Sequence, residues 1–227
     1  MKIKVFQIDE KLDRYNTEFR NYDSIIKTAG RVDPSIYKTV YNGIVDAENL
    51  ESIYTLCNTD HPVGYNGHSM SVSDVVELED GSCHFCDSFG FKELKDFDVS
   101  KTAPVVGRRM LVIEPHKEPY EMIIPDKLEA LQQAVGGYIE VTYPFDDNAF
   151  VIGNEEAKLV GLEGNRRIGD SIYAGNILIA ADDGYGGTTD LTDDQVKKYS
   201  DMFFTPEDIS PEEVKDDMGF KIIGFDE

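Results

Sequence analysis

The sequence has little cysteine, little positive charge and no long apolar run. Its three cysteines, Cys57, Cys83 and Cys86, are too few, and odd in number, for the disulfide framework of a small secreted protein. No apolar run approaches the roughly 20 residues that a membrane-spanning helix needs. Charged residues such as Lys2 and Lys4 interrupt the N-terminus too early for the apolar centre of a signal peptide. We therefore expect a soluble cytoplasmic protein with reduced thiols.

Positive charge is scarce, because 22 basic residues face 44 acidic ones and the formal net charge is −22. Direct binding to nucleic acid depends largely on lysines and arginines that displace counterions from phosphates. A chain with this balance repels both phosphates and anionic membranes. We expect no direct nucleic-acid or membrane partner, and a protein with a basic surface as the partner. The alternative is that the acidic surplus only keeps the protein soluble.

The length of the chain and its apolar content predict two domains. The sequence has 227 residues, of which 41% are hydrophobic, enough for two cores of roughly 100 residues each. We expect an α+β protein of two small domains, each a mostly antiparallel sheet with one or two packed helices, plus an acidic C-terminal segment. The predicted boundaries are 1–103, 108–204 and 205–227, with the linker near Pro104.

The first domain shows alternating and β-branched segments. They predict strands over residues 2–8, 36–45, 75–78 and 83–89, the last two joined by a hairpin turn at Glu79-Asp80-Gly81. A helix is predicted to begin at Asp46 as its N-cap, because one apolar stripe follows at i, i+3, i+4 and i+7, made of Leu50, Ile53, Tyr54 and Cys57.

The second domain shows the same mixture. Strands are predicted over residues 110–114, 138–143, 149–152 and 177–180. One helix is predicted to begin at Asp126 and end at Gly136-Gly137, and capping boxes predict two more, opened by Thr192 and by Ser210. The apolar segment 220–225 is a candidate edge strand or partner-binding segment.

Two motifs contain residue types that bind metals in other proteins. Cys83-His84-Phe85-Cys86, with Cys57, His61 and His68 as further ligands, has the spacing of a zinc site. Positions 83 and 86 of a strand point to opposite faces, however, so we expect buried free thiols. Asp182-Asp183-Gly184-Tyr185-Gly186-Gly187 lacks the ligand spacing of a calcium loop and the lysine of a phosphate cradle. We predict no metal and no cofactor.

Two polar clusters have competing interpretations. Gly164-Asn165-Arg166-Arg167 is a compact basic cluster that suits an anion or, preferably, a structural salt bridge, with Glu155-Glu156 as a nearby pair. His68, Ser71 and Asp74 contain the groups of a catalytic triad, but polar turn capping explains such serines more simply. We therefore expect no enzyme, with a small-molecule or nucleotide enzyme as an alternative.

Two resemblances add to these patterns. The run Gly67-His68-Ser69-Met70-Ser71-Val72-Ser73-Asp74-Val75-Val76, followed by Cys86-Asp87-Ser88-Phe89-Gly90-Phe91, resembles the YodL-like domain over residues 3–100. Residues 110–204 resemble a domain of unknown function common in phage and conjugative-element proteins, on the segments 112–115, 128–132, 135–137, Asn165-Arg166 and 191–195. The motif residues of unknown role are His68, Ser71, Ser73, Asp74, Asp87, Gly90, Asn165 and Arg166.

The resemblance implies an accessory protein of a bacterial mobile genetic element, often linked to antirestriction modules. Combined with the charge, it leads to the hypothesis of a counter-defence protein whose acidic surface occupies the basic nucleic-acid channel of a nuclease or CRISPR effector. The residues expected to bind are Asp182, Asp183, Asp190, Asp193, Asp194, Glu212, Glu213, Asp216 and Asp217. The alternative from another class is an interaction adaptor of the conjugation machinery.

Overall fold

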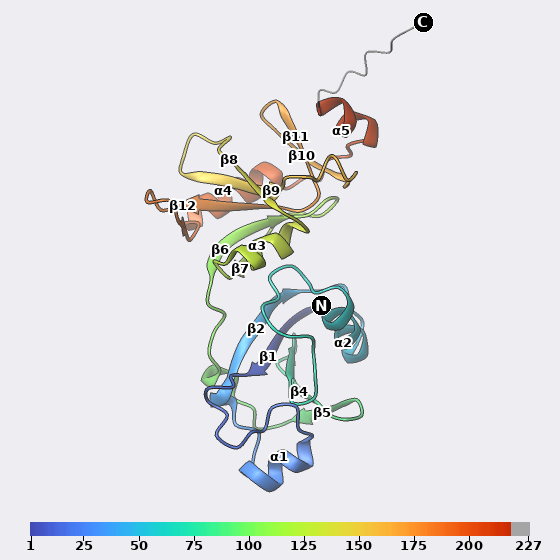
Figure 1. Cartoon of the computed structure of the whole chain (residues 1–227), viewed down its shortest axis with the longest axis vertical. Helices are drawn as coiled ribbons and strands as arrows, with labels where there is room; N and C mark the ends of the chain where they lie inside the picture. Colours follow the sequence, from blue (N-terminus) through green and yellow to red (C-terminus); the bar gives the residue numbers. More distant parts are fainter. Residues whose placement is uncertain (219–227) are drawn as a thin grey trace, which may run out of the picture. The chain divides into compact units, whose positions relative to one another are not determined.

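The protein, described here from a computed structural model, divides into two compact units, Met1–Val106 and Gly107–Glu227 (Figure 1). The structure describes residues 1–218. The expected apolar segment 220–225 lies outside the described residues.

The first unit contains one five-stranded antiparallel sheet. Its strand order is β2-β1-β3-β4-β5. The strands are β1 (Lys2–Ile8), β2 (Tyr37–Ile44), β3 (Val75–Leu78), β4 (Cys83–Cys86) and β5 (Phe91–Leu94). Strand β1 pairs with both β2 and β3, which makes it interior to the sheet and explains why most of it is buried.

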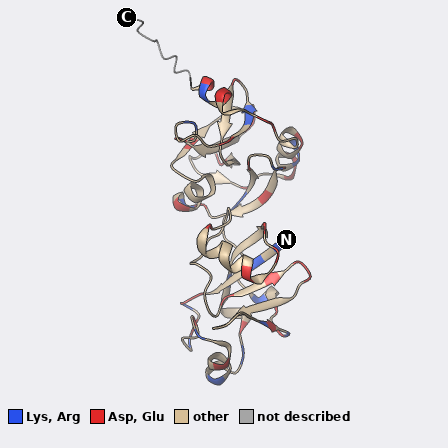
Figure 2. Cartoon of the chain, turned by 90° about the vertical axis from the view of Figure 1, so that its right-hand side faces the viewer, with Lys and Arg blue, Asp and Glu red and all other residues tan. Residues whose placement is uncertain are grey.

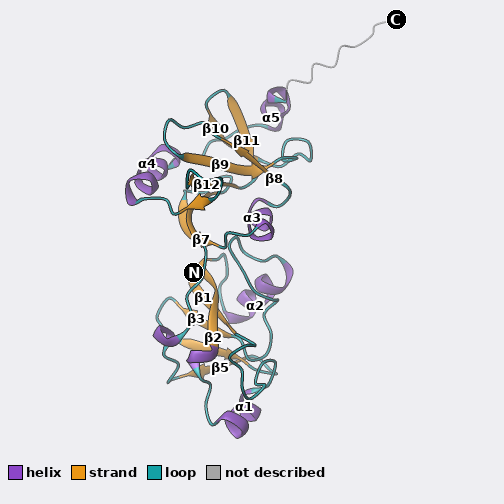
Figure 3. Ribbon diagram, turned by 60° about the vertical axis from the view of Figure 1, so that its left-hand side comes forward, coloured by secondary structure: helices purple, strands orange, loops and turns teal. Residues whose placement is uncertain are grey.

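Two α-helices complete the first unit, α1 (Tyr22–Ala29) and α2 (Leu50–Thr59), with the short 3-10 turns η1 (Pro34–Ile36) and η2 (Val99–Lys101). Figure 3 shows the helices, in purple, lying outside the strands of this sheet. Helix α1 buries Ile25 in an apolar cluster with Phe6, Tyr37 and Phe85. Helix α2 buries Ile53 and Cys57 of the predicted apolar stripe, whereas Tyr54 of that stripe is 40% exposed.

The second unit is built around a larger antiparallel sheet of order β7-β6-β12-β9-β8, with β13 paired to β12. The strands are β6 (Arg108–Ile113), β7 (Tyr120–Ile124), β8 (Ile139–Thr142), β9 (Ala149–Asn154), β12 (Ile177–Asp182) and β13 (Thr188–Thr189). A separate hairpin is formed by β10 (Gly164–Ile168) and β11 (Ser171–Ala174). Its helices are α3 (Leu128–Val135), α4 (Asp193–Phe203) and α5 (Pro211–Asp217).

The core of the second unit lies between the central strands and α4. Strands β6, β9 and β12 are almost completely buried, and Tyr199 and Phe203 of α4 pack on them. Helix α5 adds a smaller cluster in which Ile209 and Val214 contact Ala157 and Ala174. The described residues after 204 therefore pack on the second unit.

The α+β class and the two antiparallel sheets are confirmed, as are the predicted strands of both units and the two capping boxes. The predicted strand 83–89 ends earlier, at Cys86, because residues 87–90 form the turn to β5. Helix α1 and strands β5, β7, β10 and β11 were not expected from the sequence.

Two predicted helix caps are wrong. Helix α2 begins after Asn49 rather than Asp46, because Val45 exchanges backbone hydrogen bonds with Met1 and keeps the chain extended. Asn49 then forms the capping box with Ser52. Helix α3 begins after Lys127, without a side-chain cap, and the Asp126 carboxylate lies instead 3.4 Å from Arg108.

Within residues 1–218, each helix is too short or too polar to cross a bilayer.

Candidate functional site

A buried polar cluster in the first unit involves two residues from neighbouring strands, Gln7 and Asp74. Strand β1 pairs with β3 in a register that places Phe6 opposite Val75. Continuing this register by one residue brings Gln7 opposite Asp74, with both side chains on the same face of the sheet. Neither residue is exposed to solvent.

Gln7 uses both ends of its amide. Its Nε2 donates to Asp74 Oδ2 at 3.0 Å, to the His68 carbonyl at 2.8 Å and to Tyr65 Oη at 3.2 Å. Its Oε1 accepts from the His68 backbone N–H at 3.1 Å. A Cβ at position 67 would lie 2.2 Å from Gln7 Oε1, so Gly67 is required for this close approach. Residues 67–74, part of the run that resembles the YodL-like domain, therefore surround the buried side-chain amide of Gln7.

Asp74 is held in an unusual electrostatic environment. Burial raises the pKa of its carboxyl to about 8, although hydrogen bonds from the Ser71 N–H and from Gln7 act in the opposite direction. The nearby Glu18 carboxylate raises this pKa further. Oδ2 accepts both hydrogen bonds, whereas Oδ1 is buried and has no hydrogen-bond partner in the described residues. Asp74 is therefore protonated over much of the neutral range.

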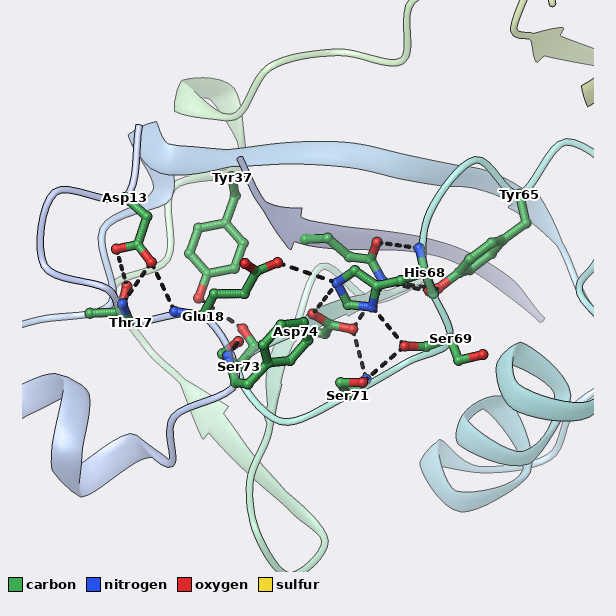
Figure 4. A network of polar contacts seen from close by, with 12 residues as sticks. Asp13, Thr17, Glu18, Tyr37, Tyr65, His68, Ser69, Ser71, Ser73 and Asp74 are labelled. Carbon is green, nitrogen blue, oxygen red and sulfur yellow. Dashed lines mark hydrogen bonds and ion pairs between the residues drawn. The ribbon is translucent and has the colours of Figure 1, made fainter. Parts of the chain in front are cut away.

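His68 lies between two carboxylates, as Figure 4 shows. Its Nε2 is 3.6 Å from Glu18 Oε1 and 4.0 Å from Asp74 Oδ1. Its Nδ1 is 2.7 Å from the Ser69 carbonyl, which requires a proton on this nitrogen. The Phe19 ring covers the imidazole, with 5.2 Å between the ring centroids. A buried carboxyl, a mostly buried carboxyl and a partly exposed imidazole thus meet at this position.

The loop of residues 9–20 closes the cluster from outside. Asp13 accepts from the backbone N–H groups of Thr17 and Glu18, and from the Thr17 hydroxyl. Burial alone would raise the Asp13 pKa, but these hydrogen bonds outweigh it and the pKa is lowered. Asn16 and Phe19 adopt φ angles of +48° and +61°. Residues other than glycine rarely adopt positive φ angles, because the backbone is then strained. The loop therefore holds a fixed shape.

Ser73 connects this loop to the sheet. Its hydroxyl accepts from the Phe19 N–H at 2.9 Å, and its carbonyl accepts from Tyr37 Oη at 2.8 Å. Ser73 is buried and has a φ angle of +84°. Backbone strain, a buried acid and a partly exposed histidine occur together here, a combination typical of functional sites.

The three side chains of the enzyme alternative do not form a relay in the described structure. The Ser71 hydroxyl donates to the Ser69 carbonyl at 3.0 Å, and its backbone N–H binds Asp74. The buried Nε2 of His68 faces the two carboxylates, and Nδ1 faces Ser69 and Gln7. Ser71 therefore has the turn-capping role that its sequence context favours.

The second half of the first motif forms a turn. Asp87 lies between β4 and β5, where its Oδ1 accepts from the Tyr22 and Ser88 N–H groups and its own N–H bonds the Gly90 carbonyl. Gly90 has a φ angle of +66°, which favours glycine. Asp87 thus joins the hairpin to the start of α1, and Phe89 at the tip is 98% exposed.

Asn165 and Arg166 have a structural role in the second unit. Asn165 Nδ2 donates to the carbonyls of Ile113 and Gly175. Arg166 is buried, and all its N–H groups are satisfied by oxygens of Asn165, Lys117 and Phe203. The Phe203 carbonyl belongs to the last residue of α4, an end that favours a cation. Arg166 therefore fastens the β10–β11 hairpin to α4 and to the segment between β6 and β7.

Arg167 pairs with different residues from those expected. Its guanidinium lies 2.6 Å from both Glu207 and Glu213. The suggested pairing with Glu155 and Glu156 is wrong: β10 pairs with β11 and is covered on this side by the segment that leads into α5. Carboxylates thus neutralise Arg167, whereas the charge of Arg166 is stabilised by neutral carbonyl and amide oxygens.

The nine acidic residues expected to bind a partner fall into two groups. The α4 group surrounds the β12–β13 turn and the start of α4; it consists of Asp182, Asp183, Asp190, Asp193 and Asp194. The α5 group consists of Glu212, Glu213, Asp216 and Asp217. Helices α4 and α5 lie on opposite sides of the second unit in Figures 1 and 3. In Figure 2 the acidic positions of the chain are drawn in red.

Some of these carboxylates form ion pairs with basic residues. Asp193 and Glu121 both bind Arg109, Glu213 binds Arg167, and Asp217 binds Lys158 at 2.5 Å. The other six have no cation at ion-pair distance among the described residues, namely Asp182, Asp183, Asp190, Asp194, Glu212 and Asp216.

The three cysteines are free and buried. Burial raises the pKa of Cys57 and Cys86 to about 12 and that of Cys83 to about 11. In residues 1–218, no group of three His, Cys, Asp or Glu side chains has the arrangement of a metal site.

Sequence reasoning singled out His68, Ser71, Ser73 and Asp74 but missed Gln7 and Glu18. The signal for Gln7 was its position on the face of strand Lys2–Ile8 that also carries Ile3 and Val5, where a polar side chain indicates a buried hydrogen-bonding role. Glu18 lies in a segment with no periodic pattern, so its position beside His68 follows only from the loop conformation.

The fold and these sites describe a two-domain α+β protein whose first domain contains a buried Gln–Asp–His cluster. Residues 2–97 match the family model of the YodL-like domain, and residues 108–204 match that of a domain of unknown function, DUF3846. The chain therefore carries a YodL-like domain followed by a DUF3846 domain, as the resemblance implied, and this composition is consistent with an accessory protein.

The match to the YodL-like domain includes all the residues of the buried cluster, and the match to DUF3846 includes Asn165, Arg166 and the α4 group. No curated protein and no solved structure matches the chain.

Proposed function

We propose that this chain is a non-enzymatic accessory protein of a bacterial mobile genetic element and that it binds a basic protein through the α4 group. The supporting observation is the surplus of carboxylates in the second unit, which has 26 acidic and 11 basic residues in the sequence and hence a formal net charge of −15. Unpaired carboxylates of this kind produce a negative field that attracts a cationic surface.

The hydrogen bonds of the α4 group favour a preorganised surface. Asp183 Oδ1 accepts from the N–H groups of Tyr185 and Gly187, and Asp182 Oδ1 accepts from Gly184. Asp190 accepts from the Arg109 N–H. Carboxylates whose positions are fixed by backbone donors lose little conformational freedom when a partner binds.

The proposed partner is the nucleic-acid channel of a host nuclease or CRISPR effector, and the proposed mechanism is competition with DNA. The channel releases its own counterions when the carboxylates replace phosphates. Binding should then weaken steeply between about 50 and 500 mM salt.

The test compares plasmid entry into bacteria that carry a restriction system or a CRISPR effector, with and without the protein. The wild-type chain should increase the number of transformants. The variant Asp182→Asn, Asp183→Asn, Asp190→Asn and Asp194→Asn should not, although each asparagine keeps an acceptor oxygen for the local hydrogen bonds.

A matched control removes the same charge from the first unit, through Asp46→Asn, Glu48→Gln, Asp60→Asn and Glu79→Gln, four exposed residues without ion pairs in the described structure. This control should protect the plasmid as the wild type does. Equal loss of protection in both variants would point to net charge alone, and no protection by the wild type against any such system would refute the proposal.

A further inference from the structure

A cavity of about 370 Å³ lies in the first unit between the loop of residues 9–20, helix α1 and the η1 turn. Its volume lies within the range of small-molecule pockets, about 300 to 1,000 Å³. Buried side chains of Ile25, Val32 and Tyr37 contribute an apolar lining. Arg14 and Arg31 also line the cavity, which therefore combines apolar side chains with two cationic ones.

The two arginines are unusual in their surroundings, because the first unit has 18 acidic and 11 basic residues in the sequence. Arg14 makes no side-chain hydrogen bond or ion pair among the described residues. Arg31 has one contact, to Asp33 Oδ1 at 3.3 Å. Both guanidinium groups therefore keep donors for an incoming anion.

The two carboxylates that line the cavity, Asp13 and Asp33, already accept hydrogen bonds from neighbouring residues. Asp13 is occupied by three donors from Thr17 and Glu18, two of them backbone N–H groups. Asp33 accepts from the Ser35 N–H at 3.3 Å as well as from Arg31. Burial alone would raise the pKa of both carboxyls, but these hydrogen bonds outweigh it, so the pKa of each is lowered and both stay ionised. The lining therefore holds two carboxylates and two guanidinium groups, and an anion would bind through the guanidinium donors that the acids leave unpaired.

The wall formed by the loop is fixed before any ligand arrives. The Asp13 hydrogen bonds close the loop, and Asn16 holds its positive φ angle. Tyr37 is fixed by its hydrogen bond to the Ser73 carbonyl. A preformed cavity avoids the entropy cost of ordering the loop on binding.

We propose that this cavity binds a small organic anion, with an aromatic or other planar apolar body against Ile25 and Val32 and one negatively charged group at Arg14 and Arg31. The site is separate from the α4 group, so it is an addition to the proposed function and does not rest on it.

The test uses the full chain and two fluorescent probes with the same aromatic body, anilinonaphthalene sulfonate and the uncharged phenylnaphthylamine. The sulfonate should saturate a single site and bind at least about tenfold more tightly than the uncharged probe, since a hydrogen bond to a charged group contributes this much. The variant Arg14→Gln, Arg31→Gln should lower the affinity for the sulfonate to that for the uncharged probe. It should leave the affinity for the uncharged probe unchanged.

Two further variants make the test specific. Arg20→Gln removes an exposed arginine at the end of the same loop that does not line the cavity, and it should bind both probes as the wild type does. Ala29→Phe places a large side chain in the cavity wall and should weaken both probes. Absence of one-site binding, equal affinity for the two probes, or an equal effect of Arg20→Gln would overturn the proposal.

Discussion

The side-chain amide of Gln7 donates to the Asp74 carboxylate across 3.0 Å, although the two residues are 67 positions apart in the sequence. This contact joins the first strand of the chain to the run 67–76, and both lie within the residues that match the YodL-like domain. It places a hydrogen-bonded amide, a carboxyl of raised pKa and the His68 backbone in one buried cluster. The stability of the first unit should therefore depend on this cluster.

Gly67 and Gln7 should be energetically coupled. A methyl group at position 67 would collide with Gln7 Oε1, so Gly67→Ala should destabilise the first unit by about 2 kcal/mol or more. Gln7→Ala leaves buried donors and acceptors unpaired and should have an effect of similar size, about 2 to 4 kcal/mol. The double variant should be less unstable than the sum of the two, because removing the Gln7 side chain removes the collision.

The measurement is urea unfolding of the three variants in a double-mutant cycle. Gln133→Ala, on the exposed side of α3, should change the free energy of unfolding by no more than about 0.5 kcal/mol. Strict additivity of Gly67→Ala and Gln7→Ala would show that the two residues do not interact as described.

Asp74→Asn should change the pH dependence of stability. Folding raises the Asp74 pKa from 3.8 to about 8, so between these values the folded chain holds a proton that the unfolded chain has lost. This group therefore lowers the free energy of unfolding as pH rises through that window, by about 1.4 kcal/mol per pH unit. Asparagine cannot lose a proton, so the variant should become progressively more stable than the wild type.

Chemical denaturation at pH 5, 6, 7 and 8 measures this difference directly. Asp60→Asn, which changes an exposed carboxylate, should follow the wild type at every pH. A constant difference between Asp74→Asn and the wild type across this range would contradict the raised pKa.

Arg166 and Arg167 should respond very differently to the same substitution. Arg166→Lys replaces a buried guanidinium whose donors all bind oxygens, and lysine cannot reproduce that planar arrangement. We expect a loss of about 2 to 4 kcal/mol in the second unit. Arg167→Lys affects only partly exposed ion pairs, so its effect should stay within about 1 kcal/mol.

Thermal or urea unfolding of the two lysine variants tests this contrast, with circular dichroism to confirm that each one folds. Similar destabilisation by both substitutions would mean that Arg166 does not have the fastening role described here.

The three cysteines should be unreactive in the folded chain. Their pKa values are raised to about 11 or 12 by burial, so almost no thiolate exists at neutral pH, and the sulfur atoms are shielded from reagents. A thiol-specific disulfide reagent should react slowly with the native protein at pH 7 and rapidly with all three thiols in denaturant. Fast reaction of one thiol in the native protein would identify a locally open region.

The sequence by itself determined most of the regular structure. Alternating apolar residues in Lys2–Ile8 and the short apolar run of residues 177–180 favour strands, and the capping boxes at Thr192 and Ser210 mark helix starts through local hydrogen bonds. These features depend on residues within a few positions of one another. The local pattern failed at Asp46, where pairing with the distant Met1 keeps the chain extended.

The tertiary structure alone decided which polar residues meet. Strand register brings Gln7 to Asp74, a strained loop brings Glu18 to His68, and the fold of the second unit divides the acidic residues into two groups. Nothing local encodes these distances, because each depends on how segments separated by tens of residues pack together. Burial then sets the Asp74 pKa, since the cost of charging a carboxyl depends on the water that the rest of the chain excludes.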